Sequence, residues 1–310
     1  MNRLSEKVTE FIGKLGKVSK MTIGADMSRE VTFRAGGTAA VLVEPSNIEE
    51  LSEILKLIHQ INVPFFIMGN GSNLLVKDQG FNGVIVKISG QAFDFIDISS
   101  DETTVTVGSG VLMGKLSRFL TEHSLSGFEF ASGIPGTIGG AVFMNAGAYG
   151  GEIKNVLISA KMLAKNGERV YTLTNEELGF SYRNSVLQQT GDVVLEATFK
   201  FEKGNKEEIK EKIKDFTAQR REKQPINYPS AGSTFKSPEG YFAAKLIQDA
   251  GLKGFSVGGA EVSTLHSGFV INKGGAKASD ILDVMEHVKT VIKKEYGVEL
   301  EPEVRILGDD

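Results

Sequence analysis

The sequence predicts an α+β protein whose strands and amphipathic helices are arranged around two uncharged glycine-rich loops. The longer loop, residues 132–151, contains seven glycines in twenty residues, too many for the interior of a helix or strand. Apolar residues are interleaved with these glycines, which is not typical of a solvated linker. We therefore expect a buried, tightly turning backbone that a flat or anionic ligand approaches closely, although an ordinary internal turn has the same composition.

Hydrophobic periodicity gives the order of elements in the first half of the chain. An amphipathic helix is expected over 4–16, and a capping box at 46–49 opens a second helix that ends before Pro64. A third helix carries Leu112, Leu116, Phe119 and Leu120 on one face. Strands are expected at 32–34 and 40–43 around a Gly36-Gly37 turn, and at 64–68, 84–88 and 103–107.

The second half begins with sheet-like patterns at 156–163, 169–173 and 193–201. A charged helix over 203–223 follows, with Ile209, Ile213 and Phe216 on its inner face. After it, helices are expected at 242–250 and 279–296, and strands at 268–272 and 304–307. The change in composition predicts one domain over 1–203, starting with a helix within about residues 1–20, and a second over 204–310.

Composition excludes several classes of protein. The chain of 310 residues has a net charge of −4, which argues against a nucleic-acid surface. It has no cysteine, so disulfides, thiolate catalysis and cysteine-bound metals are excluded. Its four histidines form no HExxH pair, and no metal site is expected. No signal peptide or membrane span is apparent, and we expect a cytoplasmic protein.

The shorter glycine loop, GNGSNL at 69–74, follows a predicted strand, as a phosphate-binding loop would. It lacks the third glycine of a dinucleotide fingerprint and the Gly-Lys-Ser/Thr of a P-loop. Asn70, Ser72 and Asn73 add neutral donors to the glycine N–H groups, which suits a diphosphate. Alone, the loop would be interpreted as a turn.

Together these loops resemble the two FAD-binding loops of the p-cresol methylhydroxylase/vanillyl oxidase fold. More narrowly, motifs along nearly the whole chain are similar to those of the UDP-N-acetylenolpyruvoylglucosamine reductase family. The motifs that carry the resemblance are TFRAGG (32–37), GNGSNLLV (69–76), SGIPGTIGGAVFMNAGAYGG (132–151), FSYRNS (180–185), PSAGSTFKSP (229–238), GGAEVSTLHSGFVIN (258–272) and LEPEVRILG (300–308).

The resemblance implies two α+β subdomains that bind FAD without a covalent link, followed by an α+β substrate-binding domain. NADPH is implied as the hydride donor. The residues expected to bind the cofactor are Gly69, Asn70, Gly71, Ser72, Asn73, Leu74, Ser132, Gly133, Ile134, Pro135, Gly136, Thr137, Gly139, Gly140, Ala141, Asn145 and Gly147.

The implied reaction reduces the enolpyruvyl ether of UDP-N-acetylglucosamine to UDP-N-acetylmuramate, a step of peptidoglycan precursor synthesis linked to cell division. By resemblance, Arg183 holds the substrate carboxylate, Ser233 donates a proton to C2, and Glu303 polarises the intermediate in either protonation state. An arginine can stabilise growing carboxylate charge through a bidentate contact. The ordinary alternatives are a surface ion pair for Arg183 and a turn serine for Ser233. The choice of Glu303 over Glu301 depends on the resemblance alone.

Four further residues are expected to bind substrate, again by resemblance: Tyr182, Lys223, Ser237 and His266. Lys223 has an alternative interpretation as the exposed end of a charged helix, and His266 as a hydrogen-bonded structural histidine. The chain has no room for the extra tyrosine loop of the family's longer members, so it resembles the shorter subclass.

Two other functions are compatible with parts of the pattern. The glycine loops alone would also suit another FAD-dependent oxidase or dehydrogenase of the same fold, or a non-catalytic nucleotide-binding relative. The combination of Arg183, Ser233 and Glu303 disfavours both. No obligate protein partner is expected, and a monomer is compatible with the sequence.

Overall fold

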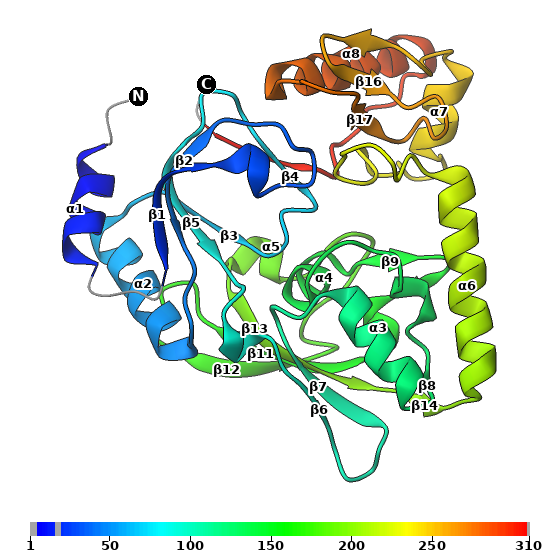
Figure 1. Ribbon diagram of the computed structural model, residues 1–310. Helices are drawn as coiled ribbons and strands as arrows, with labels where there is room; N and C mark the ends of the chain where they lie inside the picture. Colours follow the sequence, from blue (N-terminus) through cyan, green and yellow to red (C-terminus); the bar gives the residue numbers. More distant parts are fainter. Residues whose placement is uncertain (1–4, 16–19, 309–310) are drawn as a thin grey trace. The chain divides into compact units, whose positions relative to one another are not determined.

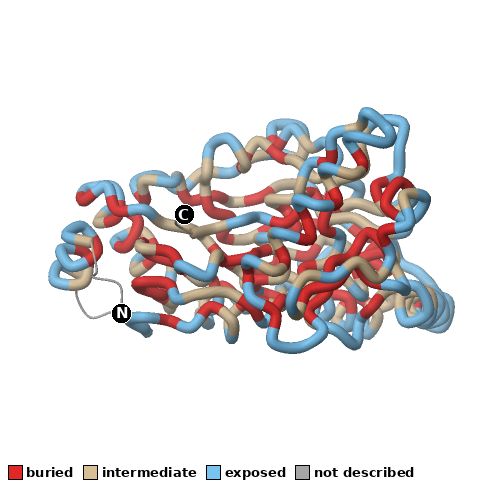
Figure 2. Tube along the Cα trace, turned by 90° about the horizontal axis from the view of Figure 1, so that it is seen from above, coloured by how far each residue is buried: buried red, intermediate tan, exposed pale blue. Residues whose placement is uncertain are grey.

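The computed structural model describes residues 5–15 and 20–308, and the chain forms two compact units (Figure 1). Unit 1 contains Met1–Ile23, Val41–Asn70 and Gly83–Ala218; unit 2 contains Gly24–Ala40, Gly71–Asn82 and Gln219–Asp310. These units divide the chain differently from the expected boundary near residue 203, which was based on composition and stays a prediction. Buried residues in each unit concentrate in the strands and on one side of the helices (Figure 2).

The first sheet has the strand order β1-β2-β5-β3, with β1 at Met21–Asp26, β2 at Thr38–Val43, β3 at Phe65–Met68 and β5 at Phe81–Lys87. Strands β3 and β5 are parallel, with Phe65 opposite Val84. Helices α1 (Glu6–Lys14) and α2 (Ile48–Ile61) contact each other. The side of α2 that carries Leu51, Ile54, Leu55 and Ile58 is buried, as its periodicity predicts.

Unit 1 also holds a five-stranded antiparallel sheet in the order β12-β11-β13-β7-β6. Its strands are β6 (Ile96–Ile98), β7 (Thr104–Gly108), β11 (Leu157–Leu163), β12 (Val170–Thr174) and β13 (Val193–Lys200). Helix α4 (Ile138–Met144) contacts β13. The hydrophobic core of this unit combines Val105, Leu116, Ile138, Val142 and Phe199, so the sheet, α3 (Met113–Glu122) and α4 share one core.

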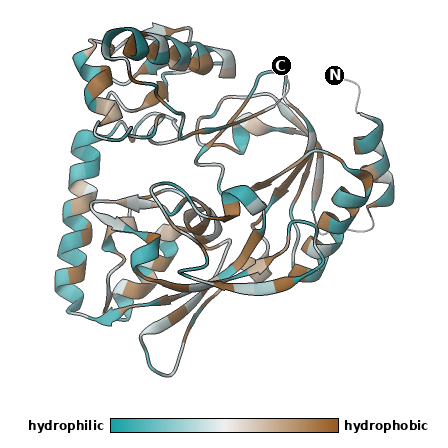
Figure 3. Ribbon diagram, turned by 180° about the vertical axis from the view of Figure 1, so that it is seen from behind, coloured by the Kyte–Doolittle hydropathy of each residue, from teal (hydrophilic) through white to brown (hydrophobic). Residues whose placement is uncertain are grey.

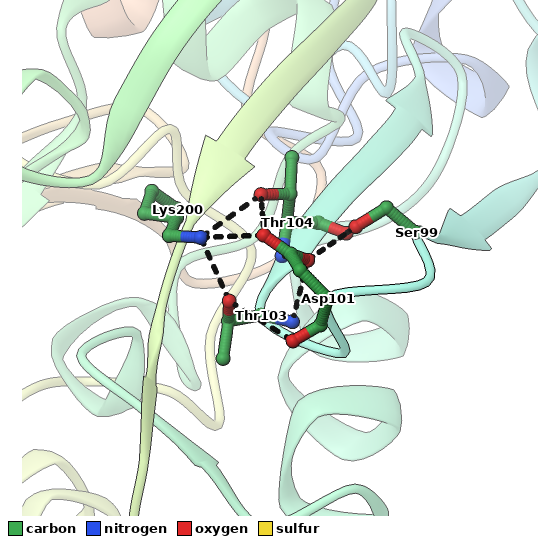
Figure 4. A network of polar contacts seen from close by, with 5 residues as sticks. All are labelled: Ser99, Asp101, Thr103, Thr104 and Lys200. Carbon is green, nitrogen blue, oxygen red and sulfur yellow. Dashed lines mark hydrogen bonds and ion pairs between the residues drawn. The ribbon is translucent and has the colours of Figure 1, made fainter.

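Polar contacts fix the tip of the β6–β7 hairpin (Figure 4). Asp101 accepts hydrogen bonds from the N–H groups of Thr103 and Thr104, at 3.0 and 2.9 Å, which closes the turn. The Lys200 Nζ group lies 2.6 Å from Asp101 Oδ2 and 2.8 Å from Thr103 Oγ1. Hydrogen bonding from Lys200, and then from Ser99, holds the pKa of the Asp101 carboxyl far below its usual range.

Short elements complete unit 1. Two two-stranded pairs join β8 (Leu125–Ser126) to β14 (Glu202–Lys203) and β9 (Gly147–Ala148) to β10 (Gly151–Glu152). Helix α5 covers Leu187–Thr190, and 3-10 helices lie at Gln91–Phe93, Glu129–Ala131 and Ile153–Asn155.

The charged helix α6 (Lys206–Lys223) is hydrophilic along most of its length, and Ile209 is its one buried residue (Figure 3).

Unit 2 is built on two small sheets. Strand β4 (Leu74–Val76) pairs in parallel with the C-terminal β18 (Arg305–Leu307), so Leu74 lies opposite Arg305. Strands β15 (Ser256–Val257), β16 (Ala260–Val262) and β17 (Val270–Asn272) form an antiparallel sheet that contacts α8 (Ala278–Tyr296). Helix α7 (Ala243–Asp249) precedes this sheet, and a 3-10 helix lies at Met27–Arg29.

Most predicted elements are confirmed within one or two residues, and three details are wrong. Residues 32–34 form a turn rather than a strand. The N-cap of α2 is Asn47, whose side chain accepts the N–H of Glu50. The Glu50 carboxylate in turn accepts the N–H of Ser46. The long glycine loop was expected to be buried and free of helix, yet α4 lies inside it and much of it is half-exposed. Its glycines 139 and 140 occupy the first turn of α4, where the backbone needs no internal partner.

None of the helices in the described residues combines the length and the apolar character that crossing a membrane requires.

We predict that Asp78→Asn destabilises unit 2 by about 1 kcal/mol, because the carboxylate caps the N-terminus of α8. Asp78 accepts the N–H of Ala278 at 2.8 Å and that of Ser279 at 2.9 Å. Although burial opposes the change, hydrogen bonds from Ser279 and Ala278 lower the pKa of Asp78. The stabilisation should therefore be complete at neutral pH and be lost as the pH falls through the lowered pKa.

Urea unfolding at pH 7 and pH 3 measures this difference. Asp283→Asn, an exposed acidic position in the same helix, is the matched control. Equal stability of the two variants at pH 7 would contradict the capping role.

Candidate functional site

The two glycine loops meet within unit 1 at Gly69 and Thr137. A Cβ atom placed on Gly69 would lie 2.4 Å from Thr137 Oγ1, so only glycine allows this approach. Thr137 is the N-cap of α4, and its hydroxyl accepts the N–H of Gly140. The backbone of Gly139, in the first turn of α4, is also held in place, because its N–H donates to Ser109 O at 2.8 Å. The loops are therefore held together by close backbone packing.

The start of this loop offers neutral donors to an anion. Among the described residues, no acceptor is found for the backbone N–H groups of Gly133, Gly136 and Thr137. Gly133 and Pro135 are exposed, and their neighbours carry no charge. This donor set suits an anionic, flat ligand such as a dinucleotide, because uncovered N–H groups bind phosphate oxygens without a cation.

A cavity of about 460 Å³ lies in unit 1 beside the end of the same loop. It is lined by Gly147, Ala148, Tyr149, Gly150, Gly151, Glu152, Lys154, Asn155, Tyr182 and Arg183. The Arg183 guanidinium donates to Gly147 O at 3.0 Å and lies 5.0 Å from the ring centroid of Tyr182. Lys154 Nζ is 2.9 Å from Glu152 Oε2. The cavity thus places a fixed guanidinium and an ion pair around one space, which can bind an anionic group.

The remainder of the shorter loop belongs to unit 2. Gly71 has a φ of +63°, and a Cβ on it would lie 2.4 Å from Glu30 O. The Asn73 side chain donates to the backbone carbonyl of Glu303 at 3.0 Å. Arg305 N–H donates back to Asn73 O at 3.0 Å. The loop therefore positions the segment that carries Glu303, a connection that the sequence does not reveal.

Ser233 and Glu303 are brought to neighbouring positions in unit 2 by Thr234. Thr234 is fully buried, and its carbonyl accepts the N–H of Glu303 at 2.9 Å. Its N–H donates to Gly268 O at 2.8 Å, and its hydroxyl accepts the N–H of Val270 at 2.9 Å. Ser233 itself is exposed, whereas Glu303 is half-buried with its Oε2 atom buried. The structure thus joins the backbones of the two segments that carry an accessible hydroxyl, on Ser233, and a half-buried carboxyl group, on Glu303.

His266 lies in the segment that Thr234 contacts. Its Nδ1 atom accepts the N–H of Gly268 at 3.2 Å, which places the proton of a neutral ring on Nε2. Its ring packs edge-on against Phe269. Burial lowers the pKa of His266, so the ring is neutral at pH 7 and presents an Nε2–H donor.

The other two residues expected to bind substrate are placed less specifically. Ser237 Oγ accepts the N–H of Ala243 at 3.4 Å, near the start of α7. Lys223 is exposed at the C-terminal end of α6. Both remain predictions as substrate contacts.

Burial divides the residues expected to bind the cofactor. Ser132, Gly133, Ile134, Pro135, Gly136, Gly139, Gly140 and Gly147 are exposed or half-exposed, as are Gly69, Asn70, Ser72 and Asn73. Gly71, Leu74, Thr137, Ala141 and Asn145 are buried by protein. The cofactor contacts of both groups stay predictions.

Sequence reasoning missed Glu152 and Lys154, which line the cavity beside Arg183. It also missed the stacking of Tyr149 on Phe216, with ring centroids 4.4 Å apart. Their position in the sequence could have indicated them, because Glu152 and Lys154 are the first charged residues after the uncharged glycine loop. The described residues contain no group of three His, Asp or Glu side chains placed to hold a metal ion.

We predict that Gly69→Ala lowers the free energy of unfolding by about 2 kcal/mol, because the new methyl group displaces Thr137 from its cap of α4. Urea unfolding followed by circular dichroism measures this loss. Gly114→Ala is the matched control: it lies in α3, and its nearest neighbouring atom would be 3.9 Å from the added carbon. If both variants unfold at the same urea concentration, the close approach does not constrain the loop.

Comparison with known proteins agrees with this arrangement. Residues 39–172 match the family model of an FAD binding domain, and residues 224–307 match that of the UDP-N-acetylenolpyruvoylglucosamine reductase C-terminal domain. The chain is 52% identical to UDP-N-acetylenolpyruvoylglucosamine reductase of Clostridium perfringens strain SM101, over 97% of each chain. It is 45% identical to the enzyme of that name from Caldanaerobacter subterraneus, over 99% of this chain and 100% of the relative.

A solved structure agrees as well. The crystal structure of UDP-N-acetylenolpyruvylglucosamine reductase from Thermus caldophilus superposes with a TM-score of 0.79 at 33% identity, covering 93% of this chain and 98% of that one. The resemblance inferred from the sequence motifs and the expected fold are thereby confirmed. The chain belongs to the UDP-N-acetylenolpyruvoylglucosamine reductase family.

Proposed function

We propose that this protein reduces the enolpyruvyl ether of UDP-N-acetylglucosamine to UDP-N-acetylmuramate, with FAD as cofactor and NADPH as hydride donor. The observation that supports the proposal is the hydrogen bond from the Glu303 N–H to the carbonyl of Thr234, the residue that follows Ser233 in unit 2. The product would enter peptidoglycan precursor synthesis, a cytoplasmic process linked to cell division. The cytoplasmic location is part of the proposal.

The glycine loops of unit 1 fit the cofactor. Uncovered N–H groups at Gly133 and Gly136 suit its diphosphate, and Gly69 packs against Thr137 without a side chain of its own. When bound, FAD accepts hydride from NADPH and passes it to C3 of the enolpyruvyl group. Asn70 and Ser72 add side-chain donors beside the loop.

Arg183 would bind the substrate carboxylate. As hydride reaches C3, negative charge builds at C2 and spreads into this carboxylate, so a fixed guanidinium stabilises the transition state more than the ground state. The bond from Arg183 to Gly147 O orients the guanidinium before substrate arrives. A carbonyl acceptor fixes this orientation without adding an opposing charge.

Ser233 would give C2 its proton, and Glu303 would polarise the intermediate from the neighbouring backbone position. The exposed Ser233 hydroxyl is accessible to a substrate, and Gly232 before it adopts a φ of +77°, which lets the chain turn there. The neutral His266 adds an Nε2–H donor that can hydrogen-bond an oxygen of the substrate. Tyr182, Lys223 and Ser237 are assigned to substrate binding in the same proposal.

The experiment that tests the function follows the visible spectrum of the purified protein under anaerobic conditions. We expect a flavin spectrum that bleaches with NADPH and returns when UDP-N-acetylglucosamine enolpyruvate is added. Recovery only with oxygen would favour an oxidase of the same fold. A protein that remains colourless after incubation with FAD would contradict the proposal and favour a non-catalytic relative.

Ser233→Ala should leave the bound flavin and its reduction by NADPH unchanged, while slowing recovery of the spectrum by at least about 100-fold. The loss is expected because the variant lacks the proton donor to C2. Stopped-flow absorbance separates the two half-reactions. The control is Ser256→Ala, an exposed serine of β15 in the same unit. Recovery at the wild-type rate would remove Ser233 from the proton transfer.

A further inference from the structure

Asn145 is a fully buried polar residue at the end of α4, and its side chain is completely engaged. Its Nδ2 group donates to Ser181 O and to Glu152 Oε2, both at 3.0 Å. Its Oδ1 atom accepts the N–H of Lys154 at 3.1 Å. A buried amide with this many partners holds three segments together, and removing it leaves their polar groups unsatisfied.

Helix capping does not account for this side chain. Asn145 is the C-cap of α4 and adopts a left-handed φ of +44°, but the capping bonds come from its backbone N–H to Ala141 O and Val142 O. A glycine would make the same backbone bonds at the same φ. The cap therefore needs only backbone groups, which leaves the three side-chain bonds available for another role.

The bond to Ser181 fixes the turn that carries Arg183. Ser181 and Asn184 exchange backbone hydrogen bonds of 3.1 and 3.2 Å, with Tyr182 and Arg183 between them. Arg183 has a φ of +53°, a conformation that costs a non-glycine residue about 1 kcal/mol. Such a conformation persists where its surroundings determine it, and it is often found at functional sites.

Further bonds hold this turn, residues 181–184, from its other side. Gln188 Nε2 donates to Arg183 O at 2.8 Å, and Ser185 Oγ donates to Phe143 O, near the end of α4, at 2.7 Å. The carbonyl groups of Ser181 and Arg183 are thus each held by a side-chain amide. Only the amide of Asn145 also reaches Glu152, which lines the cavity with Arg183.

We propose that Asn145 is a positioning residue for the reductase reaction, holding Arg183 through the Ser181 carbonyl while it also binds Glu152, which lines the same cavity. This inference rests on the proposed role of Arg183 as the carboxylate-binding cation. Asn145 touches neither substrate nor cofactor, and it acts by fixing the direction in which the guanidinium enters the cavity. A displacement of about 1 Å at such a group slows a reaction by up to about 100-fold.

The test compares Asn145→Gly with Asn62→Gly. Asn62 is also a left-handed C-cap, with a φ of +55° at the end of α2, and it is exposed, so the control removes the same atoms from a helix end. We expect Asn145→Gly to keep its FAD content and to be reduced by NADPH within about twofold of wild type. Its reoxidation by the enolpyruvyl substrate should fall by 10- to 100-fold. Asn62→Gly should reoxidise normally.

A double-mutant cycle with Arg183→Ala shows whether Asn145 acts through Arg183. If it does, Asn145→Gly slows reoxidation less than twofold further in the Arg183→Ala background. A full further loss in that background, or loss of FAD from Asn145→Gly, would overturn the inference. If Arg183→Ala is slow but Asn145→Gly reoxidises like Asn62→Gly, this inference alone fails. If Arg183→Ala itself reoxidises normally, the proposed role of Arg183 fails first.

Asn145→Asp covers the case in which Asn145→Gly does not fold. It keeps the side-chain volume and the acceptor for Lys154 N–H, and it loses the amide donor to Ser181 O and Glu152. We expect the same selective slowing of reoxidation. Wild-type reoxidation in this variant would overturn the positioning role.

Discussion

At the carboxyl end of α4, polar groups are paired with groups of other segments, and this pairing fixes the turn that carries Arg183 beside the cavity of unit 1. A helix leaves its last carbonyl groups without intrahelical partners. Here Ser185 and Gln188 donate to Phe143 O, while Asn145 donates to Ser181 O. Each bond joins α4 to the segment that follows Phe180. The groups that complete the helix therefore also determine where Arg183 lies.

Unit 2 uses the same principle with backbone groups. Thr234 bonds through its N–H and hydroxyl to the segment of Gly268 and Val270 and through its carbonyl to Glu303, and Asn73 adds a side-chain bond to Glu303 O. Because buried backbone groups must be paired, a residue next to such a junction has little freedom. Ser233 precedes Thr234 and Glu303 bonds to it, so the backbone at both residues is held in place. In both units, neighbouring side chains and backbone groups hold the residues of the proposed site in place.

The long helices and strands and the residue types of the site could be predicted from the sequence. The contacts that join these elements could not. Helix α2 and strand β13 were predicted because each buries a regular apolar pattern. Strand β1 was missed because five of its six residues are exposed, and β15 has only two residues. Asn145 was predicted as a cofactor contact because of the resemblance to the reductase family. Its burial and its bonds to Ser181 and Glu152 depend on tertiary structure that no local pattern contains.

In the proposed reaction, each unit supplies a different kind of polar group. Unit 1 supplies the cation: Arg183 is oriented by the neutral carbonyl of Gly147, while the charge of Glu152 is balanced by Lys154 at 2.9 Å. A group that stabilises developing negative charge must stay positive and must not reorient during the reaction. Unit 2 supplies proton-bearing groups instead, an exposed Ser233 hydroxyl and a His266 ring that burial keeps neutral. In the proposed reaction, these neutral groups keep their protons at pH 7 and can donate hydrogen bonds to an anionic substrate.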